Sequence, residues 1–166
     1  IEPVFKAWCA KNKLDPKKCD DAMWVRFLID RHIAVFEEFK NFLTGIGLRA
    51  PLSDISCSSQ FATAVARDRF DYVDNHFYFD HPTFPENAFQ MPFEYRNRSS
   101  VRTLFKEALT TGSTRIMGKP FTITEFNFCG PNRYRGENGP VMGGLAGLQE
   151  WDGIFRFQFY GYSRKW

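Results

Sequence analysis

Three side chains suited to nucleophilic and acid–base chemistry belong to two apolar segments of the chain. Glu125 follows the run FTIT of residues 121–124, and His76 and Tyr78 stand in the run DYVDNHFYF of residues 71–79. A carboxylate can act as a nucleophile, for example at the anomeric carbon of a sugar, and form a covalent intermediate. A nearby phenol can donate a hydrogen bond that keeps the carboxylate ionised and oriented. An imidazole can hydrogen-bond sugar hydroxyl groups or orient the phenol.

Both segments are predicted to be strands, because β-branched and aromatic residues suit a buried pleated surface. Side chains alternate along a strand, so Asp74, His76 and Tyr78 should share one face. In parallel α/β folds the functional groups gather at the carboxyl ends of the strands. We therefore expect Glu125, placed at the end of its strand, to meet His76 and Tyr78 in one cleft. A glutamate there can equally be a helix cap or a surface residue.

Helical and strand patterns alternate along the chain, which is typical of an α/β fold with parallel strands and right-handed crossovers. We expect a single domain, with a helical lead-in over residues 1–44 and strands with their helices over residues 45–166. Helices are predicted over residues 4–10, 20–44, 58–70, 99–112 and 141–151. Strands are predicted over residues 46–56, 71–79, 121–124 and 153–162. Long loops are predicted over residues 80–98 and 129–140, and such loops are often functional.

The helix at residues 20–44 has apolar residues at helical spacing, so we expect one buried stripe along it. His32 lies on the same stripe and is predicted to be a packed, hydrogen-bonded histidine. The stripe consists of Trp24, Phe27, Leu28, Val35, Phe36, Phe39 and Leu43.

Composition narrows the functional classes. The net charge is only +3, and neither a nucleic-acid-binding pattern nor a run of about 18 apolar residues occurs, so we expect no nucleic-acid or membrane partner. His76 and His81 have no second ligand cluster, and the phosphate-binding glycine motifs are absent, so neither a metal nor a cofactor is predicted. The 19 Phe residues indicate a phenylalanine-rich core, a binding surface, or both. The four cysteines form no C-x-x-C pair and leave the redox compartment open.

Three stretches, in order and spacing, resemble one family. DYVDNHFYFDHP, GKPFTITEFNFCGPNRYRGE and LQEWDGIFRFQFY are similar to strands six, seven and eight of retaining glycoside hydrolases built on a TIM barrel. The similarity is to the large clan that includes cellulase-like and β-galactosidase-like families, and it covers roughly residues 45–162. It implies the C-terminal half of a (β/α)8 barrel and a double-displacement hydrolysis of β-linked carbohydrate.

The resemblance assigns roles to several residues. Glu125 matches the catalytic nucleophile at the end of strand seven, and Tyr78 matches the residue beside it. His76 and Tyr78 match the strand-six pair that lines the substrate site, and Asn127 is a further candidate to face the cleft. An aromatic residue of strand eight usually forms the floor of the sugar site. Tyr160 is the candidate for that position, with Phe159 and Gln158 as alternatives.

The chain departs from the family in one respect. The family's general acid/base is a Glu at the end of strand four, and no Asn-Glu strand end precedes residue 45. A complete barrel needs about 250 residues, against 166 here. We therefore expect a fragment that lacks the N-terminal half of its barrel, has little activity on ordinary glycosides, and associates into dimers or larger assemblies.

Two other interpretations remain open. The chain can be a barrel relative that binds carbohydrate without catalysis, or a non-sugar α/β domain such as an open flavodoxin-like sheet. Sugar-degrading enzymes of this kind are often exported, but the residues themselves do not indicate a compartment.

Overall fold

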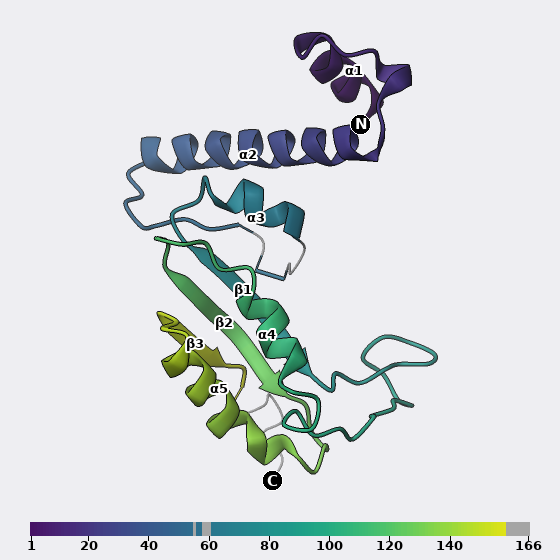
Figure 1. Cartoon of the computed structure of the whole chain (residues 1–166), viewed down its shortest axis with the longest axis vertical. Coiled ribbons are helices and arrows are strands. Elements are labelled where there is room, and N and C mark those ends of the chain that lie inside the picture. The colour runs from purple at the N-terminus through teal and green to yellow at the C-terminus, as the bar shows by residue number, and fades with distance from the viewer. Residues whose placement is uncertain (55, 58–60, 159–166) are drawn as a thin grey trace.

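The computed structural model describes residues 1–54, 56–57 and 61–158. In this part of the chain, three strands, five α-helices and two short 3-10 helices follow one another as mixed α/β structure (Figure 1). The helices are α1 (Glu2–Lys11), α2 (Asp21–Gly45), α3 (Phe61–Arg67), α4 (Lys106–Gly112) and α5 (Asn138–Leu148), with η1 (Pro16–Lys18) and η2 (Arg135–Glu137). The strands are β1 (Val73–Phe79), β2 (Phe121–Phe128) and β3 (Gly153–Arg156).

The strands form one parallel sheet in the order β1-β2-β3, which confirms the prediction of an α/β fold with parallel strands. Helices α4 and α5 lie on one face of this sheet (Figure 1). The largest apolar cluster fills the space between that face and these two helices. It comprises Val73, Phe79, Ala108, Phe121, Ile123, Phe126, Phe128, Met142 and Trp151. The opposite face of the sheet therefore has to be formed by the alternate residues of each strand.

The segment predicted as a first strand runs along the free edge of β1 without being a strand in its described residues, 46–54 and 56. The Asp71 amide donates to the Leu52 carbonyl at 3.0 Å, and the His76 amide donates to the Ser56 carbonyl. The Ser53 hydroxyl donates to the Tyr72 carbonyl at 2.9 Å. These contacts advance in the same direction on both segments, but they are too sparse for a regular ladder.

Helix α4 begins later than predicted. The apolar pattern indicated a helix over residues 99–112, but the helix begins at Lys106. Leu104 and Phe105 adopt φ angles of 56° and 55°, in the left-handed region, which interrupts a right-handed helix. The turn before α4 is held instead by Glu137, whose carboxylate accepts from the Ser99 hydroxyl at 2.6 Å and the Ser100 amide at 2.7 Å. Leu104 is consequently 75 % exposed and contributes nothing to the core.

Helix α2 is present as predicted, with the Asp20 carboxylate accepting from the Met23 amide at 2.9 Å as its N-terminal cap. The expectation of one buried stripe was wrong, because only Phe27 and Phe36 are buried. Phe27 packs against α1, whereas Phe36 packs against Phe70 after α3, with ring centroids 4.0 Å apart. The helix thus buries different sides toward two partners. Leu28 and Phe39 remain 55 % and 63 % exposed.

His32 is packed, as expected. Its ring lies against Phe70, with centroids 5.3 Å apart, and its Nε2 is 3.4 Å from the Asp54 carboxylate. Asp54 also accepts from the fully buried Arg67 guanidinium at 2.9 Å, so Asp54 connects His32 of α2 with Arg67 of α3. Across the described ranges, no helix combines the length and apolar character needed to cross a bilayer.

Candidate functional site

The side chains of β1 alternate as the sequence indicates. Val73 and Phe79 point into the apolar cluster under α4 and α5, with Phe77 packed against it. Asp74, His76 and Tyr78 lie on the other side of the strand. We call this surface, together with Thr124 and Glu125 of β2, the polar face of the sheet.

A β-bulge in β2 brings Glu125 onto the polar face. Asn75 pairs with Ile123, but the next residue of β1, His76, pairs with Glu125, so Thr124 is an extra residue without an opposite partner. Ile123 and Phe126, on either side of the bulge, are both buried in the core. Thr124 and Glu125 therefore turn away from the core together. The sequence had suggested that Glu125 lies at the end of its strand. That expectation was wrong, because the strand continues to Phe128 and Glu125 lies within it, at the bulge.

Glu125 and Tyr78 are in direct contact. The Tyr78 hydroxyl donates a hydrogen bond to Oε1 of Glu125. Burial raises the pKa of the Tyr78 phenol well above its ordinary value of 10.0, and the hydrogen bond to the Glu125 carboxylate raises it further. The phenol therefore remains a neutral donor at physiological pH and orients a carboxylate whose side chain is still 28 % exposed. An oriented and partly accessible carboxylate is suited to contact a ligand.

His76 lies on the other side of the same carboxylate. Its Nδ1 is 3.7 Å from Oε2 of Glu125 and 3.4 Å from the Ser56 hydroxyl. Its Nε2 is 2.8 Å from the Thr124 hydroxyl, on the extra residue of the bulge. The ring is thus fixed from both nitrogens and can place a polar edge beside Glu125.

Asp74 fixes the position of Thr124, the residue that contacts His76. Its carboxylate accepts from the Thr122 hydroxyl at 2.7 Å, from the Thr124 hydroxyl at 2.6 Å and from the Thr124 amide at 3.1 Å. Because the Thr124 hydroxyl donates to Asp74, its lone pairs are free to accept from Nε2 of His76. Asp74 therefore orients Thr124, and Thr124 orients His76. No role was predicted for Asp74 from the sequence, although its alternation with His76 and Tyr78 already placed it on their face.

Comparison with known proteins gives no relative, since no family model, curated protein or solved structure matches the chain. The role of the polar face is therefore inferred from its geometry and chemistry.

Of the remaining predicted site residues, the structure describes Asn127 and Gln158. The carboxamide oxygen of Asn127 accepts from Nδ2 of Asn138 at 2.8 Å and from the Phe128 amide at 2.9 Å, and it lies 3.4 Å from Nε of Arg156. That oxygen joins β2 to the start of α5, and a role of Asn127 in binding stays a prediction. Tyr160 and its alternative Phe159 lie outside the described residues, while Gln158 is exposed.

Metal binding has no geometric support in the described part of the chain. No group of three or more His, Cys, Asp or Glu side chains is arranged there to hold an ion. His81, which the sequence placed near His76, instead packs its ring edge-on against Tyr78, with centroids 5.8 Å apart. Its Nδ1 faces the Pro82 carbonyl at 2.9 Å.

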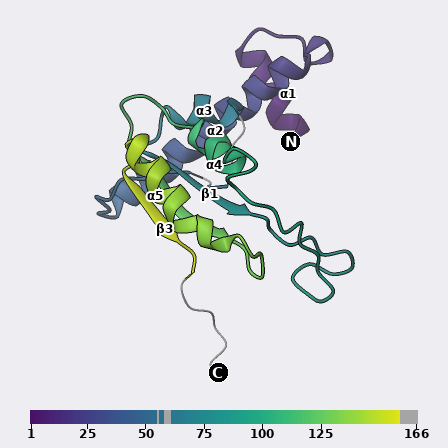
Figure 2. The ribbon, with the colours of Figure 1, turned by 60° about the horizontal axis from the view of Figure 1, so that its bottom comes forward.

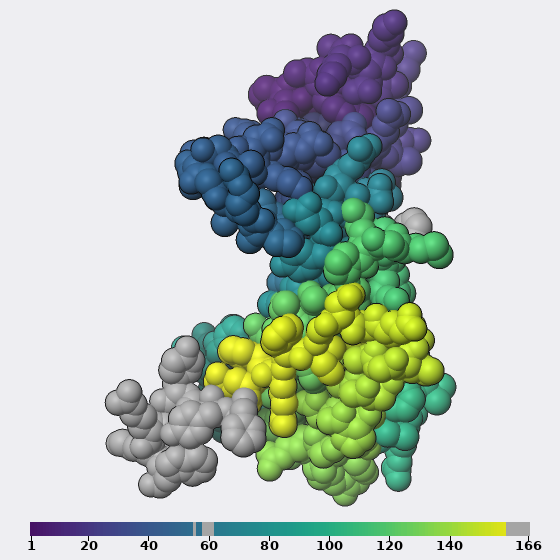
Figure 3. Space-filling model, turned by 90° about the vertical axis from the view of Figure 1, so that its left-hand side faces the viewer, coloured from purple at the N-terminus to yellow at the C-terminus, as the bar shows by residue number. Residues whose placement is uncertain are grey.

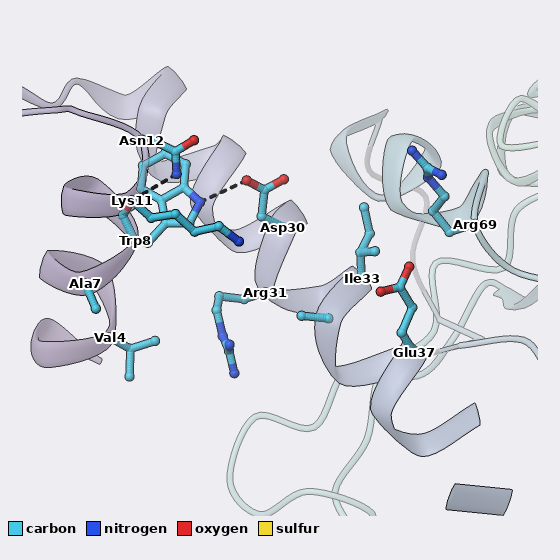
Figure 4. Close-up of a pocket in the computed structure, with 11 residues that line it drawn as sticks. Val4, Ala7, Trp8, Lys11, Asn12, Asp30, Arg31, Ile33, Glu37 and Arg69 are labelled. Carbon is cyan, nitrogen blue, oxygen red and sulfur yellow. Dashed lines mark hydrogen bonds between the residues drawn. The ribbon is translucent and has the colours of Figure 1, made fainter. Parts of the chain in front are cut away.

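Two of the hollows in the described part of the chain have linings that do not include Glu125. The first, of about 570 Å³, lies between α1, α2 and Arg69 (Figure 4). Its indole wall is fixed by a hydrogen bond from Nε1 of Trp8 to Asp30 at 2.9 Å. The second, of about 850 Å³, borders the polar face. It is lined by Lys40 near the end of α2, by Leu48 after that helix, and by Thr124 and Phe155 of the sheet. Figure 3 shows this side of the molecule, with the end of α2 in blue and β3 in yellow.

Proposed function

We propose that the polar face is the nucleophile-bearing half of a retaining glycoside hydrolase site that acts on β-linked carbohydrate. The observation that carries this proposal is the hydrogen bond from the Tyr78 hydroxyl to the Glu125 carboxylate, with His76 on its other side. A carboxylate held in this way is oriented, as attack on an anomeric carbon requires.

The roles follow from the contacts. Glu125 would attack the anomeric carbon and break its bond to the leaving-group oxygen, which takes up a proton. Water would then cleave the glycosyl–enzyme ester, releasing the sugar and restoring the carboxylate. Tyr78 would hold the unreacted carboxylate oxygen, because its raised pKa keeps the phenol protonated. His76 would bind a sugar hydroxyl with the ring edge that faces Glu125. None of these steps uses a metal or a cofactor.

We also propose that the sheet is part of a TIM-barrel-like architecture. The support is the parallel order of β1, β2 and β3, with α4 and α5 on one face and polar side chains on the other. Residues 52–54 and 56 lie beside β1 where a preceding parallel strand would lie. In such a barrel the polar face would point inward, toward the substrate.

A second candidate function is carbohydrate binding without catalysis. A retaining mechanism needs two carboxyl groups about 5–5.5 Å apart. The other carboxylate on the polar face, Asp74, is buried and occupied by Thr122 and Thr124. Within the described residues, the polar face therefore supplies a nucleophile without an available acid, which is the observation that favours this second candidate.

Covalent trapping tests the proposal. The protein is incubated with a panel of dinitrophenyl 2-deoxy-2-fluoro-β-glycosides, whose leaving group departs without acid assistance, and its intact mass is measured. We expect a gain of one fluoroglycosyl group on at least one sugar, mapped by peptide sequencing to Glu125. Glu125→Gln should take up no label, whereas Glu38→Gln, an exposed glutamate of α2, should label like the wild type.

Two results separate the candidates. Label on another residue, or equal labelling of Glu125→Gln, contradicts the nucleophile assignment. The absence of label from every sugar, combined with retention of the chain in gels that contain a β-linked polysaccharide, supports the binding protein instead.

A further inference from the structure

The loop between β1 and α4 carries several aromatic side chains, among them the largely exposed Phe89. It begins directly after β1, at Asp80, and projects away from the sheet over residues 81–98 (Figure 2). The sequence predicted a long loop here, and it lies at the end of the strand that carries His76 and Tyr78. Its position makes it the nearest candidate for contacts with a ligand larger than one sugar.

The base of the loop is firmly attached to the rest of the fold. Thr83 and Glu94 exchange backbone hydrogen bonds at 3.0 and 2.9 Å, which closes the loop as a hairpin. The buried Asp80 carboxylate accepts from Nδ2 of Asn132 at 2.6 Å, and the Tyr95 hydroxyl donates to the Gly130 carbonyl. The loop is therefore held from both ends against the loop that follows β2.

A continuous row of rings extends from Tyr78 into this loop. His81 packs against Tyr78 with centroids 5.8 Å apart, Phe84 against His81 at 6.2 Å, and Phe89 against Phe84 at 5.3 Å. Phe93 continues the row on a second branch, 6.3 Å from Phe84. His81 and Phe89 also lie 6.3 Å apart, so the rings of His81, Phe84 and Phe89 are clustered, and two ring contacts connect Phe89 to Tyr78.

The outer part of the row lies in water. Phe89 is 81 % exposed, Met91 72 % and Phe93 39 %. Apolar groups gathered in this way on a soluble surface commonly mark a binding site. Exposed amides and carboxylates stand between them, among them Glu86, Asn87 and Gln90. Rings that stack and neighbouring groups that hydrogen-bond are together the two contacts that a sugar ring needs.

We infer that the rings of residues 81–95 bind further sugar units of a polysaccharide whose cleavage or binding point lies at Glu125. The inference rests on the proposed function and extends it, since it makes the ligand a β-linked chain rather than a short glycoside. The Tyr78–His81 contact is the physical continuity between the two, because Tyr78 touches both Glu125 and the first ring of the row.

Other classes of ligand fit this surface less well. Residues 81–98 contain two Glu and two Arg, so the loop has no excess of positive charge to attract phosphate backbones or anionic lipid surfaces. A protein partner would use the rings alone and would gain nothing from their connection to Tyr78. Binding of a protein is therefore an alternative that the experiment must distinguish.

Length-dependent binding tests the inference. The intact chain is first screened by affinity electrophoresis against soluble β-glucans, β-mannan, β-xylan and β-galactan. Disaccharides and hexasaccharides of each retained polymer are then titrated by calorimetry into the wild type, Phe89→Ala and Phe93→Ala. Met117→Ala, which removes a fully exposed apolar side chain elsewhere, is the matched control. Because Phe89 is 81 % exposed, its replacement should leave the circular dichroism spectrum and the urea midpoint unchanged.

We expect Phe89→Ala to weaken hexasaccharide binding by about five- to tenfold, in line with the loss of one stacking contact, and to leave disaccharide binding unchanged. Met117→Ala should bind like the wild type. Equal hexasaccharide affinities for the wild type, both Phe variants and the control would overturn the inference. The exposed rings would then be better explained as a surface that binds a protein. If fluoroglycosides still label Glu125 in that case, the proposed function survives and only the ring row is wrong. If no polymer binds and no label forms, the proposed function fails and the inference fails with it.

Discussion

The contact between Tyr78 and Glu125 should make the folded chain sensitive to alkaline pH, and Tyr78→Phe isolates that effect. Burial raises the pKa of the Tyr78 phenol above 10.0, and the Glu125 carboxylate raises it further. Above about pH 10 the unfolded chain releases this proton while the folded chain retains it. The unfolded state then binds fewer protons than the folded state, so the free energy of unfolding falls as the pH rises.

The difference in unfolding free energy between the wild type and Tyr78→Phe can be worked out near neutral pH and again above about pH 10. Near neutral pH, Tyr78→Phe loses one hydrogen bond to a carboxylate that is 28 % exposed, so we expect a loss of about 1 kcal/mol. In the wild type, one pH unit above the unfolded-state pKa removes at most about 1.4 kcal/mol. The wild type should therefore lose its advantage over Tyr78→Phe between roughly pH 10.5 and pH 11. Beyond that crossing the variant should be the more stable protein.

Urea unfolding, followed by tryptophan fluorescence at a series of pH values, measures this crossing. The quantity to plot is the difference between the two proteins, because contributions from other titrating groups cancel in it. Glu125→Gln provides a second comparison. Without the carboxylate, burial remains the largest cause of the raised Tyr78 pKa but acts without the Glu125 contribution, so the loss of stability should end at a lower pH than in the wild type. A difference between wild type and Tyr78→Phe that stays constant up to about pH 11.5 would refute the contact.

Three further predictions concern the thiols and the core. Burial raises the pKa of Cys129 to about 11, which reduces its thiolate roughly a hundredfold relative to a thiol of ordinary pKa. Iodoacetamide near pH 8 should therefore alkylate the exposed Cys57 first, as peptide mass mapping can show. Sγ of Cys9 and Sγ of Cys19 are 3.6 Å apart, so diamide should join them, with a loss of two hydrogens in the intact mass and about 2.5 kcal/mol of added stability. Phe70→Ala, which empties a fully buried ring site, should lower the free energy of unfolding by about 3–4 kcal/mol in a urea titration.

Local patterns in the sequence predict the elements whose causes are local. Asp20 caps α2 as its position suggests, and the alternation in residues 71–79 gives the correct two faces of β1. These two predictions depend only on the period of the chain and on the preferences of single residues. The convergence of Glu125, His76 and Tyr78 was expected because parallel strands bring corresponding positions side by side, but Glu125 reaches that face through a bulge that the expectation did not include.

Other features depend on contacts between distant parts of the chain, and local patterns missed them. The late start of α4 reflects Glu137, more than thirty residues onward, which binds Ser99 and Ser100 and holds the preceding turn outside the helix. The expectation of a single apolar stripe along α2 was wrong because the two buried positions of the helix, Phe27 and Phe36, pack against different partners. Neither fact can be read from helical spacing alone.

The position of Glu125 is the most instructive case, because regular alternation would have placed it wrongly. Phe121 and Ile123 point into the core, so an unbroken strand would direct Glu125 into the core as well. The bulge at Thr124 reverses that outcome, and it allows Phe126 and Phe128 to return to the core after it. The signal is present in the sequence, since the apolar residues 121, 123, 126 and 128 are spaced by two, three and two. A single gap of three in a pattern of two indicates one extra residue, and bulges of this kind commonly re-aim a side chain beside an active site. The spacing that exposes Glu125 also places the Thr124 hydroxyl between Asp74 and His76. One bulge in β2 therefore positions both the Glu125 carboxylate and the hydrogen bonds that orient His76 beside it.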